Sequence, residues 1–229
     1  MAGGLGTRMG RFTDRIPKAL IPVNGEPFIR RQLRNLQMNG IQEVVICTGY
    51  LGHQIEEEIS RNAPGGLAVS CVPDGDVLLG TGGSVRRLSE MGLLDDVFMY
   101  TYGDSFLTVD HADVAGTFDP ARFDALMTVC ENSEGHETSN ALVVGDRVAT
   151  YKKGLADPDM HWIDYGLSVI KRETVEKLVP PGKPSDIAIM FETLAGQSRL
   201  QAYCSSSRYF EIGSESGLAE LEQYLGSSS

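Results

Sequence analysis

Glycines and basic residues gather near the N-terminus in a pattern that could bind phosphate. Gly3, Gly4 and Gly6 fall within four positions, and Arg8 and Lys18 follow them. Because glycine has no Cβ, such a loop lets backbone N–H groups approach phosphate oxygens, and basic side chains add charge for a polyphosphate. A glycine-rich turn also occurs in many loops that bind nothing, so this motif needs support from elsewhere in the chain.

The distribution of charge favours a small anionic ligand at this end of the chain. The formal net charge is −11, yet the first 18 residues carry four basic residues against one acidic residue. An acidic surface repels nucleic-acid backbones and anionic membranes, so neither is predicted as a partner. The alternative is a chance basic cluster on a solvated face.

One carboxylate stands where a metal ion could be held. Asp104 follows an apolar run at 97–102. Ligands of open α/β sheets bind at the carboxyl ends of strands, and Mg²⁺ prefers carboxylate and phosphate oxygens together. The alternative is an Asp that caps the next turn. Glu211 lies shortly before a predicted helix, where its position alone indicates a surface Glu that precedes a helix cap.

A second glycine-rich segment, Leu79-Gly80-Thr81-Gly82-Gly83-Ser84, leads into a predicted helix. Small residues at a helix N-terminus leave room for a flat ligand against the backbone at Gly80, Thr81 and Gly82. Taken alone, the segment favours an ordinary glycine-rich helix start.

The predicted strands alternate with helices. Short, continuously apolar runs predict strands at 43–48, 67–72, 97–102 and 125–130, and residues 141–151 read as a β-hairpin with a tight turn at Gly145-Asp146. Strand–helix alternation at this spacing predicts a mostly parallel, doubly wound sheet.

Helical periodicity appears in five segments. Pro27 suits the first turn of a helix, Ser185 is the expected cap of another, and the last helix is expected after Ser214. The apolar residues that mark the faces of these five helices are Ile29, Leu33 and Leu36; Ile55 and Ile59; Val85 and Leu88; Ile187, Met190, Phe191 and Leu194; and Leu218, Leu221 and Leu225.

The segments Ala2–Met9 (AGGLGTRM) and Ile16–Val23 (IPKALIPV) together resemble the sugar nucleotidyltransferase superfamily, whose signature is A-G-G-x-G-T-R-L followed by P-K-x-L-x-P-V. The resemblance implies an α/β fold with a Rossmann-like three-layer doubly wound mixed sheet and a small antiparallel hairpin subregion. It implies a single domain over 1–225, with a nucleotide-binding half (1–110) and a sugar-phosphate-binding half (111–225). Residues 226–229 are expected to form a flexible tail.

The resemblance also implies an activity: a nucleoside triphosphate and a sugar 1-phosphate give a nucleoside-diphosphate sugar and pyrophosphate, with Mg²⁺ as cofactor. The implied residues are Arg8 and Lys18 for catalysis; Ala2, Gly3, Gly4, Gly6, Thr7, Gly80, Thr81 and Gly82 for the nucleotide; Asn140, Lys153, Asp164 and Gly166 for the sugar phosphate; and Asp104 and Glu211 for the metal. Each sugar-phosphate residue could equally lie in a solvated polar loop.

The sequence departs from the family pattern at three of these places. Glu211 stands where the family has Asp in W-x-D-I-G-T-P, and Asp164 lies in a segment similar to I-N-A-G-I. Gly154 replaces the proline of E-K-P beside the lysine. Within the family, the sequence most resembles the subgroup that contains heptose 1-phosphate guanylyltransferases and N-acetylmuramate 1-phosphate uridylyltransferases. The nucleotide base and the sugar of the substrates are left open.

Two other functions are considered. A glycosyltransferase of related fold usually carries a D-x-D metal motif, which Gly103-Asp104-Ser105 does not provide. A catalytically silent, nucleotide-sugar-binding regulatory paralogue would be expected to lose Arg8, Lys18 or Asp104, and this chain keeps all three.

The remaining features indicate a cytoplasmic protein. No apolar run reaches about 18 residues, so no membrane span or signal peptide is expected. Cys47, Cys71, Cys130 and Cys204 are far apart and are expected to be reduced.

The first strand of the family raises one further expectation. The family places an apolar strand directly before the glycine-rich loop, whereas this sequence starts at Met1-Ala2. Either the start codon is assigned too late or Met1 is the end of a shortened strand. We expect an added upstream apolar segment to raise thermal stability and activity.

Overall fold

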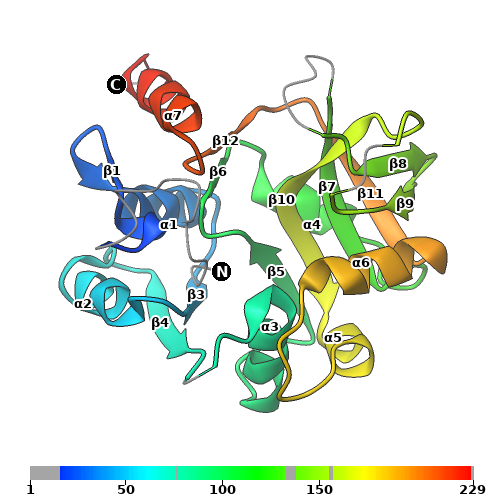
Figure 1. The fold of residues 1–229 in the computed structure, drawn as a ribbon, viewed down its shortest axis with the longest axis horizontal. Coiled ribbons are helices and arrows are strands. Elements are labelled where there is room, and N and C mark those ends of the chain that lie inside the picture. The colour runs from blue at the N-terminus through cyan, green and yellow to red at the C-terminus, as the bar shows by residue number, and fades with distance from the viewer. Residues whose placement is uncertain (1–15, 76, 133–137, 155–156, 228–229) are drawn as a thin grey trace. The chain divides into compact units, whose positions relative to one another are not determined.

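The computed structural model describes residues 16–75, 77–132, 138–154 and 157–227 (Figure 1). The candidate residues Ala2, Gly3, Gly4, Gly6, Thr7 and Arg8 lie outside the described residues. The described chain divides into two compact units. Unit 1 holds the residues up to Leu78, Tyr102–Phe106 and those from Tyr209 onward, and unit 2 holds Leu79–Thr101 and Leu107–Arg208.

Unit 1 is built on a parallel strand pair flanked by helices. Strand β3 pairs with β4 from Glu43↔Ala68 to Thr48↔Pro73, which confirms the first two predicted strands to within one residue. Its elements are the 3₁₀ turn η2 (Lys18–Leu20), β1 (Pro22–Val23), β2 (Glu26–Pro27), α1 (Phe28–Met38), β3 (Glu43–Thr48), α2 (Gly52–Asn62), β4 (Ala68–Pro73), β12 (Tyr209–Glu211) and α7 (Glu215–Ser227). Strand β6 (Ser105–Leu107) pairs with β12.

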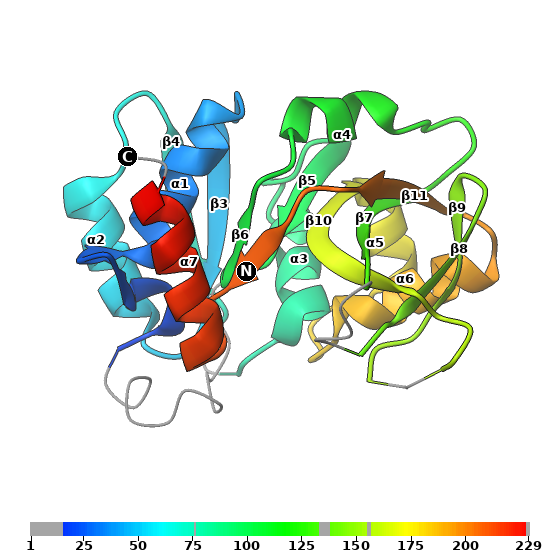
Figure 2. The same ribbon diagram turned by 90° about the horizontal axis from the view of Figure 1, so that it is seen from above.

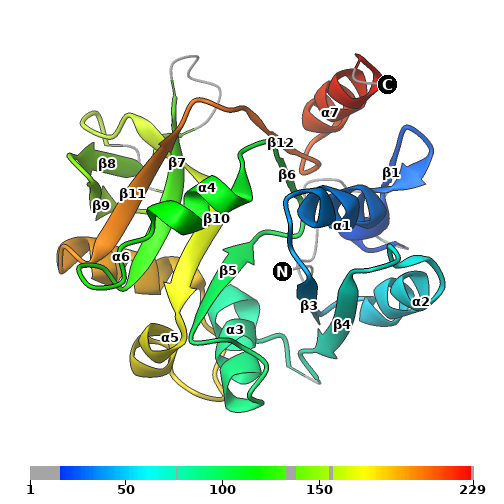
Figure 3. The same cartoon turned by 180° about the vertical axis from the view of Figure 1, so that it is seen from behind.

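The predicted apolar faces form the core of unit 1. Leu33 and Leu36 of α1 pack with Ile55 and Ile59 of α2 around Ile46 of β3, and Figure 3 shows these elements side by side. Burial of these large aliphatic side chains supplies the main stabilising term for this layer. A second cluster holds Val23, Phe28, Phe106, Phe210, Ile212 and Leu221.

The last helix is longer than expected. Helix α7 continues through Gly226 and Ser227, the first two residues of the expected flexible tail. The hydroxyl of Ser227 donates to the carbonyls of Gln223 and Tyr224, which stabilises the final turn. At the other end, the Ser214 hydroxyl accepts a hydrogen bond from the N–H of Gly217, and the helix begins after Ser214 as expected.

Unit 2 is a six-stranded sheet with helices on both faces. The strand order is β5-β10-β7-β11-β9-β8. Figure 2 shows this sheet between α4 on one face and α3, α5 and α6 on the other. The elements are α3 (Gly80–Glu90), β5 (Val97–Thr101), α4 (His111–Thr117), β7 (Ala125–Glu131), β8 (Ala141–Val144), β9 (Arg147–Tyr151), β10 (Trp162–Lys171), α5 (Arg172–Leu178), α6 (Ile187–Gly196) and β11 (Leu200–Ser205).

This sheet is more antiparallel than strand–helix alternation predicted. Strands β7 and β11 are parallel, but β10 runs antiparallel to both β5 and β7. The expectation of a mostly parallel sheet was wrong because β10 was not predicted, whereas the mixed sheet and the hairpin at 141–151 are confirmed. The turn of that hairpin uses Gly145 at φ +63°, which glycine adopts at low cost.

The expected cap of α6 also needs correction. Asp186, and not Ser185, caps the helix, because its carboxylate accepts a hydrogen bond from the N–H of Ala188. The backbone of Ser185 is used in contacts with the start of α3. Among the described residues, no helix is long and apolar enough to cross a membrane.

Candidate functional site

Lys18 is held by a short, well-anchored turn in unit 1. The N–H of Leu20 donates to the carbonyl of Pro17 at 2.8 Å, and the N–H of Ile21 donates to that of Lys18 at 3.1 Å. Ala19 and Ile21 are buried on either side of Leu20, so the backbone at Lys18 is fixed from the core. The backbone of Lys18 is therefore held rigidly, although a lysine side chain is flexible by itself.

The ammonium of Lys18 contacts the predicted metal ligand Asp104. Its Nζ donates to Oδ2 of Asp104 at 2.5 Å, with 20% and 34% of the two side chains exposed. The same Asp104 accepts a hydrogen bond on its backbone carbonyl from the N–H of Ile212 at 3.0 Å. Ile212 directly follows Glu211, the other predicted ligand, in the chain.

Gly213 shows that Lys18 and Glu211 also converge. A Cβ atom at Gly213 would lie 3.0 Å from Nζ of Lys18 and 3.5 Å from Oε2 of Glu211. A side chain at this position would therefore displace the Lys18 ammonium by a few tenths of an ångström. The structure therefore brings together Lys18, Asp104 and Glu211, three residues that the motifs singled out in separate parts of the sequence.

This donor set suits a hard divalent ion. Two carboxylates supply oxygen ligands, and Mg²⁺ commonly takes one or two carboxylates together with substrate phosphates and water. Among the described residues there is no group of three or more His, Cys, Asp or Glu residues that could hold a metal by themselves. Asp104 and Glu211 could supply two oxygen ligands of the kind that Mg²⁺ takes together with phosphate and water.

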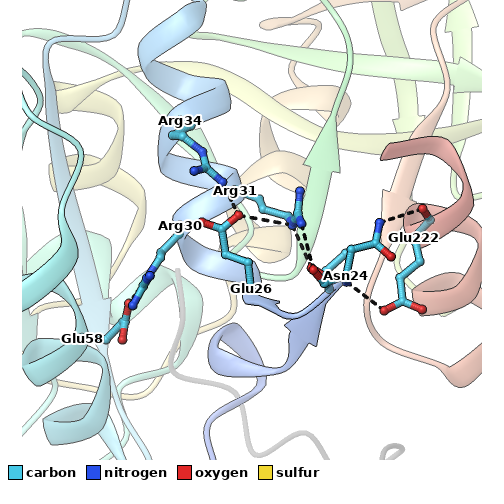
Figure 4. A network of polar contacts seen from close by, with 8 residues as sticks. Asn24, Glu26, Arg30, Arg31, Arg34, Glu58 and Glu222 are labelled. Carbon is cyan, nitrogen blue, oxygen red and sulfur yellow. Dashed lines mark hydrogen bonds and ion pairs between the residues drawn. The ribbon is translucent and has the colours of Figure 1, made fainter. Parts of the chain in front are cut away.

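A polar network anchors the hairpin that follows Lys18 (Figure 4). Nε of Arg31 donates to the carbonyl of Val23 at 2.9 Å, and Glu26 forms ion pairs with Arg31 and Arg34. On the other side, the backbone N–H of Asn24 donates to Oε1 of Glu222, and its Nδ2 donates to that residue's carbonyl. The hairpin is therefore fixed to α1 and α7. The Asn24-Gly25 pair was the available signal for it.

The glycines of 80–83 serve the packing of unit 2. A Cβ at Gly80 would lie 2.7 Å from the carbonyl oxygen of Ser185, and one at Gly83 would lie 2.7 Å from that of Lys183. The N–H groups of Gly82 and Gly83 both donate to the Ser185 carbonyl, at 2.8 and 3.3 Å. These two donors of the helix N-terminus are thus engaged by protein.

Thr81 and Lys153 both contact Asp186, a residue that none of the sequence motifs indicated. The hydroxyl of Thr81 donates to Oδ1 of Asp186 at 3.0 Å, and Nζ of Lys153 donates to Oδ2 at 2.9 Å. Desolvation alone would raise the pKa of Asp186, but the hydrogen bonds from Lys153, Ala188 and Thr81 outweigh it and the pKa is lowered. Asp186 is therefore held as a carboxylate.

The other sugar-phosphate candidates form one hydrogen-bonded group. Oδ1 of Asp164 accepts the N–H of Gly166 at 2.9 Å, and Oδ2 accepts the hydroxyl of Tyr151 at 3.2 Å. The N–H of Asp164 donates to Oδ1 of Asn140 at 2.9 Å. The group lies where the register of β10 against β7 shifts between Asp164 and Ser168, and Gly166 has φ +95° there.

Tyr151 is a further member that the sequence did not reveal. Its ring is buried edge-on against Phe191. Burial is the main cause that raises the pKa of its hydroxyl, and the negative charge of Asp164 is the second. It therefore stays protonated and donates to Asp164. A tyrosine at a strand end reads as core, and only the structure shows its polar contact.

Comparison with known proteins identifies a matching family and named relatives. The family described as MobA-like NTP transferase domain matches residues 1–146. The glucose-1-phosphate cytidylyltransferase of Salmonella typhimurium is 29% identical over 55% of this chain and 62% of its own length. The chain thus spans under two thirds of that relative. The N-acetylmuramate alpha-1-phosphate uridylyltransferase of Caulobacter vibrioides is 23% identical over 93% of this chain and 90% of its own.

Solved structures show the same fold. The crystal structure of HddC from Yersinia pseudotuberculosis has a TM-score of 0.82 and 19% identity, and it covers 98% of this chain and 96% of its own. At that identity the likeness establishes the Rossmann-like nucleotidyltransferase fold. With the family match over more than half of the residues, the chain belongs to the family of the MobA-like NTP transferase domain.

Proposed function

We propose that the protein is an enzyme that transfers a nucleotidyl group from a nucleoside triphosphate to a sugar 1-phosphate and releases pyrophosphate. The observation that carries the proposal is the convergence of Lys18, Asp104 and Glu211 in unit 1. The names of the relatives support it, since the two described above act on sugar 1-phosphates.

The chemistry requires charge and position rather than a general base. An oxygen of the sugar phosphate is already an anion and can attack the α-phosphorus directly. The barrier comes from bringing two anionic substrates together and from charge that develops on the phosphoryl oxygens, so fixed positive groups supply the catalysis. We assign that role to Lys18 and to Arg8, which would hold the triphosphate and the departing pyrophosphate.

Asp104 and Glu211 would hold Mg²⁺. When bound, the ion would supply positive charge next to the phosphate oxygens. Lys18 has three N–H donors, and its bond to Asp104 uses one of them, so the same ammonium can bind phosphate while it stays beside the carboxylate. The ion pair therefore keeps the ammonium of Lys18 beside a carboxylate that would hold the metal.

The substrate contacts complete the proposal. Residues 1–110 would bind the nucleotide, through Ala2, Gly3, Gly4, Gly6, Thr7, Gly80, Thr81 and Gly82. Residues 111–225 would bind the sugar phosphate, through Asn140, Lys153, Asp164 and Gly166. Asp164 is an acceptor already oriented by two protein donors, which suits a sugar hydroxyl as a further donor.

A matrix of nucleoside triphosphates against sugar 1-phosphates, read by pyrophosphate release, tests the proposal. Turnover of at least one pair is expected, and Arg8→Ala or Asp104→Ala should abolish it with the fold intact. Nucleotide-sugar binding without turnover would favour the regulatory paralogue, and sugar transfer from a nucleoside-diphosphate sugar would favour a glycosyltransferase. Normal turnover in either variant would contradict the assigned site.

The metal assignment has its own test. Chelation should stop pyrophosphate release, and added Mg²⁺ should restore it. Glu211→Gln should raise the Mg²⁺ concentration needed for half-maximal activity, because it removes one anionic ligand, whereas Glu211→Asp keeps the charge. An unchanged Mg²⁺ requirement in Glu211→Gln would remove this residue from the metal site.

A further inference from the structure

Asp186 joins three elements of unit 2 through its two carboxylate oxygens. Oδ1 accepts hydrogen bonds from the hydroxyl of Thr81 on α3 and from the N–H of Ala188 in the first turn of α6, each at 3.0 Å. Oδ2 accepts Nζ of Lys153, which follows β9, at 2.9 Å. One side chain therefore fixes the start of α3, the start of α6 and the candidate phosphate-binding lysine to one another.

The contact between α3 and α6 is reciprocal and tight. Oγ1 of Thr81 accepts the N–H of Ile187 at 2.9 Å while it donates to Asp186. The N–H of Ser185 donates to the carbonyl of Leu79 at 2.8 Å, so the two segments are joined by backbone as well. Asp186 thus stands on a rigid support, and its Oδ2 has a defined position for a charged partner.

Lys153 needs such a partner to be well placed. About half of its side chain is exposed (53%), and a lysine in water samples many rotamers. The bond to Asp186 restricts the ammonium to one region and uses one of its three N–H donors. Two donors are left for the oxygens of an anionic ligand.

We propose that Asp186 is a positioning residue that fixes the ammonium of Lys153 for the phosphate of the sugar substrate. The same carboxylate holds Thr81 at the start of α3, so it also fixes the position of Lys153 relative to Thr81. The inference rests on the proposed function for the identity of the anion. It assigns a role to a residue outside the motifs, and it connects a residue predicted for the nucleotide with one predicted for the sugar phosphate.

The substitution Asp186→Asn separates this role from a structural one. Asparagine caps helices about as well as aspartate, and its Oδ1 can still accept from Thr81 and Ala188. Its Nδ2 cannot accept from Lys153. We expect the melting temperature to change little, the KM for the sugar 1-phosphate to rise about tenfold, and the KM for the nucleoside triphosphate and kcat to change less.

Lys153→Met and the double variant show whether Asp186 acts through the lysine. If it does, Asp186→Asn adds little to the KM of the Lys153→Met protein, because the shared contact is already lost. Glu192→Gln is the matched control: it removes the same charge from the same helix, beside Lys152 at 3.8 Å, and should leave the KM for the sugar 1-phosphate near that of the wild type. Additive effects, or a lower KM in Asp186→Asn, would overturn the proposal.

A measurement without turnover keeps this inference apart from the proposed function. Side-chain ¹⁵N NMR of the lysine ammonium groups, assigned with Lys153→Met, should show a restrained Lys153 signal in the wild type that is lost in Asp186→Asn and kept in Glu192→Gln. Equal Lys153 mobility in all three proteins contradicts positioning. Absence of pyrophosphate release by the wild type, with the NMR difference present, counts against the proposed function alone.

Discussion

Nζ of Lys18 lies 2.5 Å from Oδ2 of Asp104, although 86 positions separate the two residues in the chain. Each residue is fixed by its own backbone contacts, Lys18 by the turn that follows Pro17 and Asp104 by its bond from Ile212. An ion pair of partly exposed groups adds at most about 1 kcal/mol to stability. Stability alone therefore gives this pair little weight, and the proposed role of both residues in the site has to be tested by activity.

Lys18→Met should remove activity without unfolding the protein. It deletes the ammonium and keeps an aliphatic chain of similar length, so the buried neighbours Ala19 and Ile21 remain packed. We expect kcat/KM for pyrophosphate release to fall on the order of 100-fold or more, as when a group aimed at developing charge is removed. Lys177→Met, an exposed change on α5, is the control. Equal activity of both variants would contradict the role of Lys18.

Gly213→Ala tests the same site by a single added methyl group. The new Cβ would lie 3.0 Å from Nζ of Lys18, so the ammonium must shift by a few tenths of an ångström, and 3.5 Å from Oε2 of Glu211, an ordinary contact distance. Because displacement of reacting groups by about 1 Å can cost on the order of 100-fold in rate, we expect a smaller loss of activity from this shift. The substitution Gly116→Ala in α4 meets nothing within 4 Å and serves as control.

The two glycine variants should differ in activity and not in stability. Alanine restricts the unfolded chain and in compatible backbone conformations stabilises by about 0.4–1 kcal/mol. Assays of pyrophosphate release together with thermal melts therefore separate the two effects. A fully active Gly213→Ala protein would show that the reaction does not depend on the position of the Lys18 ammonium beside Gly213.

The sequence predicted the individual parts of the fold better than their pairing. The strand at 43–48 was predicted to the residue because the β-branched residues Val44, Val45 and Ile46 form an uninterrupted run at its centre. Strand β10 was missed because Asp164 and Gly166 interrupt its apolar pattern, and those residues form the shift in register. Once β10 is absent from the prediction, its antiparallel pairing with β5 and β7 is lost as well.

The site shows the same limit. Motif spacing selected Lys18, Asp104 and Glu211, but their convergence depends on the pairing of β6 with β12, a long-range contact that no local pattern encodes. Asp186 and its neighbour Ser185 are both good helix caps, so their types alone could not decide which one caps α6. The roles of Arg8 and of the glycines before it stay predictions, since these residues lie outside the described part of the chain.

Asn24→Ala should destabilise unit 1 through the hairpin after Lys18. Asn24 has φ +47°, a conformation that costs alanine about 1–2 kcal/mol, and its Nδ2 donates to the carbonyl of Glu222. We expect a loss of about 1–3 kcal/mol in the free energy of unfolding by urea. Asn24→Gly relieves the backbone cost and loses only the side-chain bond, so it should lie between the wild type and Asn24→Ala. The reverse order would contradict this account.

Asp124 should make stability depend on acid pH. The hydrogen bonds from Arg199, at 2.8 and 2.7 Å, and then the one from Lys171 hold the pKa of this carboxyl below its usual range in the folded protein. A depressed pKa means that the unfolded chain takes up the proton first as the pH falls. The stabilisation is thus complete above the unfolded pKa of about 3.9 and is lost as the pH falls through the lower folded value.

Asp124→Asn isolates this contribution. At pH 7 it should lower the free energy of unfolding, because Arg199 loses its two-point carboxylate contact, and below about pH 4 its curve should approach that of the wild type. Asp95→Asn, an exposed change in the same unit, should leave the curve nearly parallel to the wild type. Urea unfolding at intervals between neutral and acid pH measures all three proteins. A constant difference between Asp124→Asn and the wild type across that range would show that the ion pair does not set the acid sensitivity.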